Sequence, residues 1–306
     1  MRNKTVLSVS VGIPAYNEEK NIKKLMDSIL SQTIDNYVLK EIIIVSDRST
    51  DNTVKLIKKV KNKKIKLIIN DHRLGLAMSQ NKLIENFSGD ILILFNADVL
   101  PTNKNFIANV VKPFYKDSNL GIIAPKLVPL KAEGFIEKII NYSVSFKKNA
   151  YEKWNNGNNL LLCCGGCRVF SKKFLSNFKF PKLVAEDAYS YLACKKRQLN
   201  FLYFPHAAVH YRSPDNFYDH QLQSARFLES PQELTKYFPD QLVIKNYALP
   251  KSILIKTAIQ YLIKNPFLFI SYLMIFVLIV LNPNKRYFLN RKWHPAISTK
   301  YLLDEK

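Results

Sequence analysis

Residues 89–101, GDILILFNADVLP, decide the fold of this chain. Five apolar residues, Ile91 to Phe95, precede the polar stop Asn96-Ala97-Asp98, which is typical of a buried parallel strand. Ligands of open α/β sheets bind at the carboxyl ends of such strands. The side-chain oxygens of Asn96 and Asp98 are expected at that end, where they suit a hard divalent cation such as Mg²⁺ or Mn²⁺. The alternative is that Asp98 only caps a turn before Pro101.

The sequence before this stretch alternates between strands and helices. Short links join them, which predicts a Rossmann-like, mainly parallel α/β sheet flanked by helices. Asp47 and Arg73 fall in the loops after the second and third strands, where a carboxylate suits a ribose or base and a guanidinium suits a diphosphate. Their alternatives are a turn residue and a surface cation. Strands are predicted over 6–13, 41–45 and 64–69, and helices over 18–30, after Asn52, and over 75–87.

The sequence after it is less regular. Gly165-Gly166 interrupts the apolar run 160–170 and permits either a close backbone approach or a strand bulge. Asp187 falls at the start of a predicted helix, where an acid also suits the helix dipole. Beyond residue 101 we predict a helix over 103–116, a strand over 120–128, an amphipathic segment over 134–154, a helix over 188–196, and short strands over 201–204 and 207–210.

The charge balance points to an anionic partner. Lys and Arg number 46 against 24 Asp and Glu, so the net charge of the 306 residues is +22. Phosphorylated ligands and an anionic membrane surface fit this charge. No nucleic-acid-binding motif is present, so we predict no nucleic-acid partner. The four cysteines lack metal-site spacing and are expected to be reduced, which fits a cytoplasmic catalytic domain.

The C-terminal part predicts membrane association. Residues 253–263 read as an interfacial amphipathic helix, and 267–281 carry no charge. Sixteen residues from Pro266 span roughly 24 Å as a helix, less than the roughly 30 Å hydrocarbon core of a bilayer. A re-entrant or monotopic hairpin is the first interpretation. A single span and a helix buried in a soluble core or dimer interface are the alternatives. We therefore predict a catalytic domain over 1–230 (halves 1–100 and 101–230), a linker over 231–251 and a membrane-associating tail over 252–306.

Three segments carry a resemblance to a known family. They are VGIPAYNEEKNIKKLMDSILSQT, IIIVSDRSTDNT and HRLGLAMSQNKLIENFSGDILILFNADV. Together they resemble family-two glycosyltransferases, inverting nucleotide-sugar enzymes with the GT-A fold. Two residues depart from the family's pattern: Arg48 replaces a glycine, and Asn96 replaces the first aspartate of the metal motif.

The resemblance implies roles for the donor residues. Asp98 would hold the divalent cation that clamps the nucleotide diphosphate, with Asn96 beside it and His210 as a further metal ligand. Pro14, Tyr16, Glu18 and Asp47 would line the nucleoside pocket, with Arg73 and Asn81 nearby.

The second half has matching acceptor motifs. Asp187, preceded by Glu186, would be the catalytic base that deprotonates an acceptor hydroxyl. The sequence Gln223-Ser-Ala-Arg226-Phe227 resembles the Q-x-x-R-W motif of membrane-linked members, with Arg226 on the diphosphate and Phe227 on an acceptor sugar. Gly165 and Gly166 would form the wall shared by donor sugar and acceptor, with Cys167 and Arg168 close to it.

These implications define the expected function. The protein would move a sugar from a nucleotide-diphosphate sugar to a lipid-linked or cell-envelope glycan acceptor, with inversion and with help from Mg²⁺ or Mn²⁺. One alternative is a polyprenyl-phosphate sugar synthase, whose phosphate acceptor needs no base. Another is a non-catalytic nucleotide-sugar-binding scaffold, which Asn96 and Arg48 favour. The sequence predicts no oligomeric state.

Overall fold

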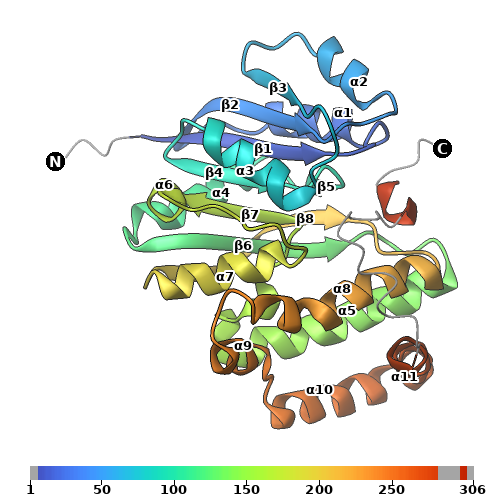
Figure 1. The fold of residues 1–306 in the computed structure, drawn as a ribbon. Helices are drawn as coiled ribbons and strands as arrows, with labels where there is room; N and C mark the ends of the chain where they lie inside the picture. Colours follow the sequence, from blue (N-terminus) through green and yellow to red (C-terminus); the bar gives the residue numbers. More distant parts are fainter. Residues whose placement is uncertain (1–5, 282–296, 302–306) are drawn as a thin grey trace.

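The computed structural model describes residues 6–281 and 297–301. Within them, one eight-stranded sheet runs in the order β3-β2-β1-β4-β7-β6-β8-β5, with helices on both faces (Figure 1). The strands are β1 (Leu7–Ala15), β2 (Tyr37–Ser46), β3 (Ile65–Ile69), β4 (Ile91–Phe95), β5 (Val99–Pro101), β6 (Leu120–Pro129), β7 (Cys167–Ser171) and β8 (Asn200–Tyr211).

The first half matches the sequence prediction. Strands β1 to β4 pair in parallel, and helices α1 (Ile22–Leu30), α2 (Thr53–Lys59) and α3 (Leu76–Asn86) connect them. All five residues of β4 are buried because neighbouring strands and helical layers cover them on every side. The run 91–95 therefore reads as continuously apolar, and Asn96 and Asp98 follow it at the sheet edge, as predicted.

The second half is mixed rather than mainly parallel. Strand β7 runs antiparallel to both β4 and β6, and β5 runs antiparallel to β8. In the apolar run 160–170, the strand begins only at Cys167, because the two glycines fall in the turn before it, and it continues to Ser171. The two strands predicted over 201–204 and 207–210 form one strand, β8, whose pairing with β6 shifts register between Pro125 and Lys126.

The predicted linker over 231–251 is mostly helical. Helix α8 (Phe217–Leu234) continues into it, and α9 (Asp240–Tyr247) follows. Leu234, Phe238 and Val243 are buried in the same apolar cluster as the helix that carries Asp187. This segment therefore belongs to the folded catalytic domain. The remaining helices up to here are α4 (Phe106–Val111), α5 (Phe135–Lys153), α6 (Lys172–Leu175) and α7 (Glu186–Lys196).

Helices α10 (Lys251–Lys264) and α11 (Pro266–Leu281) pack on α5, at the end of the molecule opposite α2 (Figure 1). Phe146 of α5 contacts the rings of Tyr261, Phe269 and Tyr272. None of the helices in the described part of the chain is both long and apolar enough to cross a membrane. The predicted single span thus finds no support there, and the rest of the predicted tail, 282–296 and 302–306, lies outside the described residues.

Candidate active site

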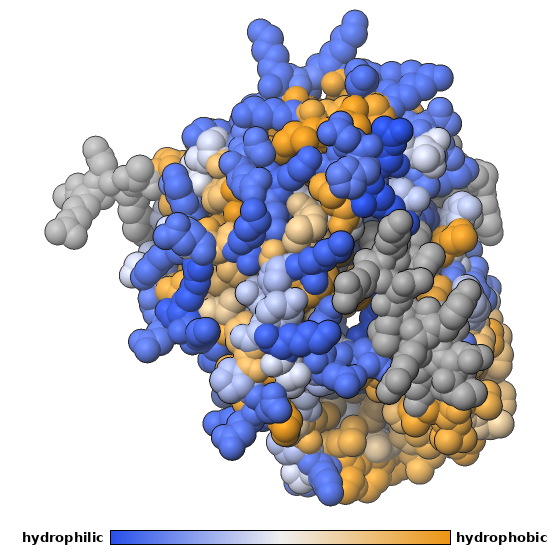
Figure 2. All heavy atoms as spheres, viewed as in Figure 1, coloured by the Kyte–Doolittle hydropathy of each residue, from blue (hydrophilic) through white to orange (hydrophobic). Residues whose placement is uncertain are grey.

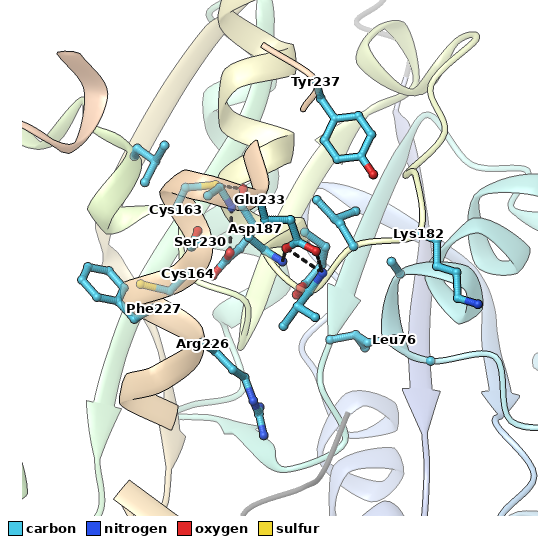
Figure 3. Close-up of a pocket in the computed structure, with 18 of the residues that line it drawn as sticks. Leu76, Cys163, Cys164, Lys182, Asp187, Arg226, Phe227, Ser230, Glu233 and Tyr237 are labelled. Carbon is cyan, nitrogen blue, oxygen red and sulfur yellow. Dashed lines mark hydrogen bonds between the residues drawn. The ribbon is translucent and has the colours of Figure 1, made fainter. Parts of the chain in front are cut away.

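Two adjoining cavities open beyond the carboxyl end of β4. The smaller, of about 330 Å³, includes Asp98, and the larger, of about 550 Å³, includes Phe227. Asn96, Asp187, Gln223 and Arg226 line both cavities, so residues that lie more than 120 positions apart in the sequence meet at one boundary. Figure 3 shows Asp187 in the larger cavity, with Arg226 and Phe227 from α8 on one side and Lys182 on the other.

Asp98 and Asn96 both line the smaller cavity. The Asn96 backbone nitrogen donates to the Gly166 carbonyl at 2.9 Å, which ties the end of β4 to the glycine turn. Burial raises the pKa of Asp98, and the cations of Lys300 and Arg226 oppose that rise. That Asp98 and Asn96 bind a cation stays a prediction from the sequence.

Glu186 and Asp187 begin α7 but have different surroundings. The Arg168 guanidinium, fully buried on β7, donates to the Glu186 carbonyl at 3.0 Å and lies 3.4 Å from its carboxylate. Burial and the neighbouring Asp187 raise the pKa of Glu186 to about 7. Burial also raises the pKa of Asp187, although Arg168 counteracts this. Asp187 borders both cavities, which is the placement required of a catalytic base.

Gly165 lets the chain pass close to these carboxylates. A Cβ atom added there would lie 3.2 Å from Glu186 Oε1 and 3.7 Å from Asp187 Oδ2. One added at Gly166 would lie 3.0 Å from the Leu127 side chain. The double glycine leaves room for this close approach, and it lies in the turn before β7 rather than in a strand bulge. Cys167 is buried in β7 opposite Phe95, away from both cavities.

Helix α8 supplies the opposite wall. Burial lowers the pKa of Arg226 to about 10, and the carboxylates of Glu186 and Asp98 partly offset that effect. The guanidinium therefore remains positively charged at neutral pH. Phe227 is 49% exposed, and its ring centroid lies 6.2 Å from that of Tyr247. The predicted Gln223-x-x-Arg226-Phe227 motif is thus on one helix, facing the site.

Glu233 was not predicted as a site residue, because it fell in the expected linker. Its carboxylate accepts hydrogen bonds of 2.9 Å from the backbone nitrogens of both Val184 and Ala185, just before α7 (Figure 3). This contact fixes the start of the helix that carries Asp187. A glutamate on a helix gives no sequence signal for such a role.

Asp47 has a structural role in the predicted nucleoside region. Its buried carboxylate accepts from Asn70 Nδ2 at 2.7 Å and from the Leu74 and Gly75 backbone nitrogens at 2.8 Å. It lines neither cavity and fixes the loop before α3. Arg48 has φ of +61°, so the residue that replaces the family's glycine keeps the left-handed backbone, at a cost of roughly 1–2 kcal/mol.

The other residues predicted to bind the donor fall into two groups. Tyr16, Glu18 and Arg73 meet near the loop after β1, whereas Pro14 and Asn81 have partners elsewhere in the fold. Tyr16 and Glu18 lie on the loop after β1, with the Arg73 guanidinium 3.9 Å from the Tyr16 ring centre. Glu18 forms an ion pair of 2.9 Å with Lys300, a residue that the sequence analysis did not single out. Pro14 pairs with Val45 inside the sheet. The Asn81 side chain donates to the Phe180 carbonyl and accepts from the Phe180 backbone nitrogen, both at 2.8 Å.

His210, predicted as a further metal ligand, lies on β8, and that role stays a prediction. It pairs with Leu100 and Val128 within the sheet and lines neither cavity. Because β8 is continuous, His210 is paired within a strand and does not lie in a loop. Among the described residues, no group of three or more His, Cys, Asp or Glu side chains is placed to hold a metal. All four cysteines are free, as expected.

A Rossmann-like half leads into two adjoining cavities that share Asp187 at their boundary, and comparison with known proteins gives the class of protein. The family described as glycosyl transferase family 2 matches residues 10–178, so this chain belongs to that family and is a glycosyltransferase.

Individual relatives are more distant. WfgD of Escherichia coli, named a UDP-Glc:alpha-D-GlcNAc-diphosphoundecaprenol beta-1,3-glucosyltransferase, is 28% identical over 205 residues, covering 61% of this chain and 70% of that protein. A Methanococcus voltae UDP-N-acetylglucosamine–dolichyl-phosphate N-acetylglucosaminyltransferase is 28% identical over 211 residues, covering 61% and 80%. The solved mannosyltransferase PcManGT of Pyrobaculum calidifontis, in complex with GDP-Man and Mn²⁺, is 17% identical with a TM-score of 0.60, covering 99% and 89%, which shows the shared fold.

Proposed function

We propose that this glycosyltransferase moves a sugar, with inversion, from a nucleotide-diphosphate sugar to a hydroxyl group of a lipid-linked glycan. The observation that carries the proposal is the position of Asp187 on the boundary of the two cavities, with a raised pKa. Relatives whose names specify diphosphoundecaprenol-linked or dolichyl-phosphate acceptors support the acceptor class.

The smaller cavity suits the donor diphosphate. Arg226 supplies a fixed positive charge, and Asp98 with the Asn96 amide supplies oxygen atoms. Two such side chains fit a Mg²⁺ or Mn²⁺ ion that takes its remaining ligands from phosphate and water. Such an ion would neutralise the charge that develops on the departing diphosphate. The relatives' structures with Mn²⁺ support this cofactor class.

The larger cavity suits the acceptor. The aromatic rings of Phe227, Tyr237 and Tyr247 line it, and rings of this kind stack on sugars. Lys182 and Lys236 also line it and offer positive charge to a phosphate of a lipid-linked acceptor. An acceptor hydroxyl in this cavity reaches the donor sugar only across the boundary that Asp187 occupies.

Asp187 then acts as the general base. Its carboxylate takes the proton of the acceptor hydroxyl while that oxygen attacks the anomeric carbon from the face opposite the diphosphate. The raised pKa brings its basicity closer to neutral pH, where a catalytic base is most effective. Arg168 holds Glu186, and Gly165 leaves space for both carboxylates, so the base stays oriented.

The test is transfer by Asp187→Asn, with purified nucleotide sugars and an undecaprenyl-diphosphate-linked GlcNAc acceptor. Loss of a general base is expected to lower the rate about 10²- to 10⁴-fold while donor binding is retained. Wild-type activity should fall as the pH is lowered, because protonated Asp187 cannot accept the proton. Full activity in a folded Asp187→Asn protein would remove Asp187 from the mechanism.

The second candidate is transfer to a polyprenyl phosphate, which the dolichyl-phosphate relative favours. A phosphate acceptor is already ionised, so Asp187→Asn would retain transfer to it. Assaying the same variant with undecaprenyl phosphate and with the GlcNAc-linked acceptor therefore distinguishes the two functions.

We further propose that the apolar surface of α10 and α11 rests on the cytoplasmic face of an anionic membrane. Ile255, Ile259 and Ile263 are 57%, 53% and 77% exposed and share one side of α10. Phe267 and Met274 of α11 are 66% and 64% exposed. Figure 2 shows hydrophobic residues gathered at this end of the molecule. Lys251, Lys256 and Lys264 of α10 are exposed and suit anionic headgroups.

A further inference from the structure

The short 3₁₀ helix η5 (Ile297–Lys300) crosses the donor side of the active site. Figure 1 shows it beside the carboxyl ends of the strands, well away from α10 and α11. The Ser298 backbone nitrogen and hydroxyl donate to Asp219 Oδ2 of α8 at 2.8 and 2.6 Å. The Lys300 carbonyl accepts from Asn21 Nδ2 at 2.7 Å. This segment, residues 297–300, therefore bridges α8 and the loop that follows β1, and we call it the C-terminal strap.

The strap delivers a lysine to the cation region. Lys300 Nζ donates to the carbonyls of Tyr16 and Asn17 and lies 2.9 Å from Glu18 Oε1, with its side chain 12% exposed. Lys300 also lines the smaller cavity together with Asp98, and its charge opposes the rise in the pKa of Asp98. The ammonium thus has an all-oxygen shell beside a second carboxylate, which is the environment that a hard cation selects.

The negative charges of Glu18 and Asp98 explain why a cation is needed beside them. Glu18 is 4% exposed, its carboxylate lies 2.9 Å from Lys300 Nζ, and Lys300 lines the smaller cavity together with Asp98. Two acidic side chains in so small a buried region repel each other unless a positive charge lies between them. In the structure, Lys300 supplies that charge.

We propose that Lys300 is the resident cation of the donor site and competes with the divalent cation for the Glu18–Asp98 region. The docked C-terminal strap therefore opposes the binding of a free divalent ion. The ion binds well only when it arrives together with the nucleotide diphosphate. The inference rests on the proposed function, because it takes Asp98 as the ligand of that ion.

The test measures Mn²⁺ binding to the full-length protein without nucleotide, by titration calorimetry or by the electron paramagnetic resonance signal of free Mn²⁺. Lys300→Met is expected to bind Mn²⁺ at least about tenfold more tightly than wild type, because a like charge at contact distance is removed. Lys300→Arg, which keeps the charge, should stay near wild type. Asp98→Asn combined with Lys300→Met should lose the gain.

A second variant guards against misfolding of Lys300→Met. Ser298→Ala keeps the lysine but removes one of the bonds to Asp219, so it should tighten Mn²⁺ binding by a smaller factor. Unchanged or weaker Mn²⁺ binding in both folded variants would overturn the inference. It would also be overturned if Lys300→Met kept wild-type Mn²⁺ affinity while losing affinity for nucleoside diphosphate, since Lys300 would then be a phosphate ligand. Because Mn²⁺ binding is read without turnover, failure of sugar transfer alone would count against the proposed function and not against this competition.

Discussion

Glu233 Oε2 lies 2.9 Å from the backbone nitrogen of Ala185, two residues before Asp187. The same oxygen accepts from Val184, so a single carboxylate on α8 anchors the start of α7. The two walls of the larger cavity are thereby joined just before the residue that we propose as the catalytic base. In that proposal Glu233 is a positioning residue, because it bonds to the backbone at the start of the helix that bears Asp187.

Glu233→Ala should therefore reduce turnover more than it reduces donor affinity. A shift of the base by about 1 Å can cost on the order of 100-fold in rate. Kinetics at saturating donor would give the expected fall in kcat. Glu233→Gln, which keeps one oxygen that can accept from both backbone nitrogens but loses the negative charge, should recover part of it. Equal losses in donor affinity and turnover, or no rescue by glutamine, would show that Glu233 does not act through the position of Asp187.

Gly165→Ala tests the close approach of the glycine turn to the carboxylates. The added methyl group would lie 3.2 Å from Glu186 Oε1, so we expect a loss of about 1–3 kcal/mol in the free energy of unfolding and a clear loss of activity. Gly134→Ala is the matched control, because a Cβ there meets nothing within 4 Å. Denaturant unfolding and transfer assays on both variants provide the comparison, and equal behaviour of the two would contradict the steric argument.

Stability should depend on pH through Glu186. Its pKa is raised from 4.5 to about 7 in the folded protein, so the folded state holds the proton more tightly than the unfolded chain. This contribution is present below pH 4.5 and is lost as the pH rises toward 7. Glu186→Gln should flatten that decline by on the order of 3 kcal/mol, since one pKa unit corresponds to about 1.4 kcal/mol. Urea unfolding of both proteins from pH 4.5 to 8 measures it, and parallel curves would refute the assignment.

The proposed membrane surface can be tested with vesicles. Replacing Ile263 and Met274 by serine should weaken binding to vesicles that contain anionic lipid by about tenfold or more, because each large apolar side chain contributes roughly 1.5–3 kcal/mol when fully buried. Ile34→Ser is the control, since Ile34 is 57% exposed and follows α1, which Figure 1 shows at the end of the molecule opposite α10 and α11. Co-sedimentation with anionic and with neutral vesicles gives the readout. If the double variant and wild type bind alike, another surface carries any lipid contact.

The sequence determined the parallel half of the fold and much of the site. Continuous apolar runs such as 91–95 can be buried only in a central strand, so Asn96 and Asp98 had to emerge at the ligand-binding edge. Local helical spacing likewise placed Gln223 and Arg226 on one face. Both predictions depend on short-range patterns that the chain itself displays.

Only the tertiary structure decided which residues meet. Asp47 has the position of a ligand-binding loop residue. Its carboxylate nevertheless accepts three hydrogen bonds from within the protein, from the Asn70 side chain and from the backbone nitrogens of residues 74 and 75. His210 lies within a continuous strand because β6 and β8 stay paired across a register shift. No local sequence pattern predicts that shift. Glu233 and Lys300 reach the site from 48 and 282 residues away from their partners Ala185 and Glu18, respectively. Contacts at such separations are set by packing of whole elements, and the sequence carries no periodic signal for them.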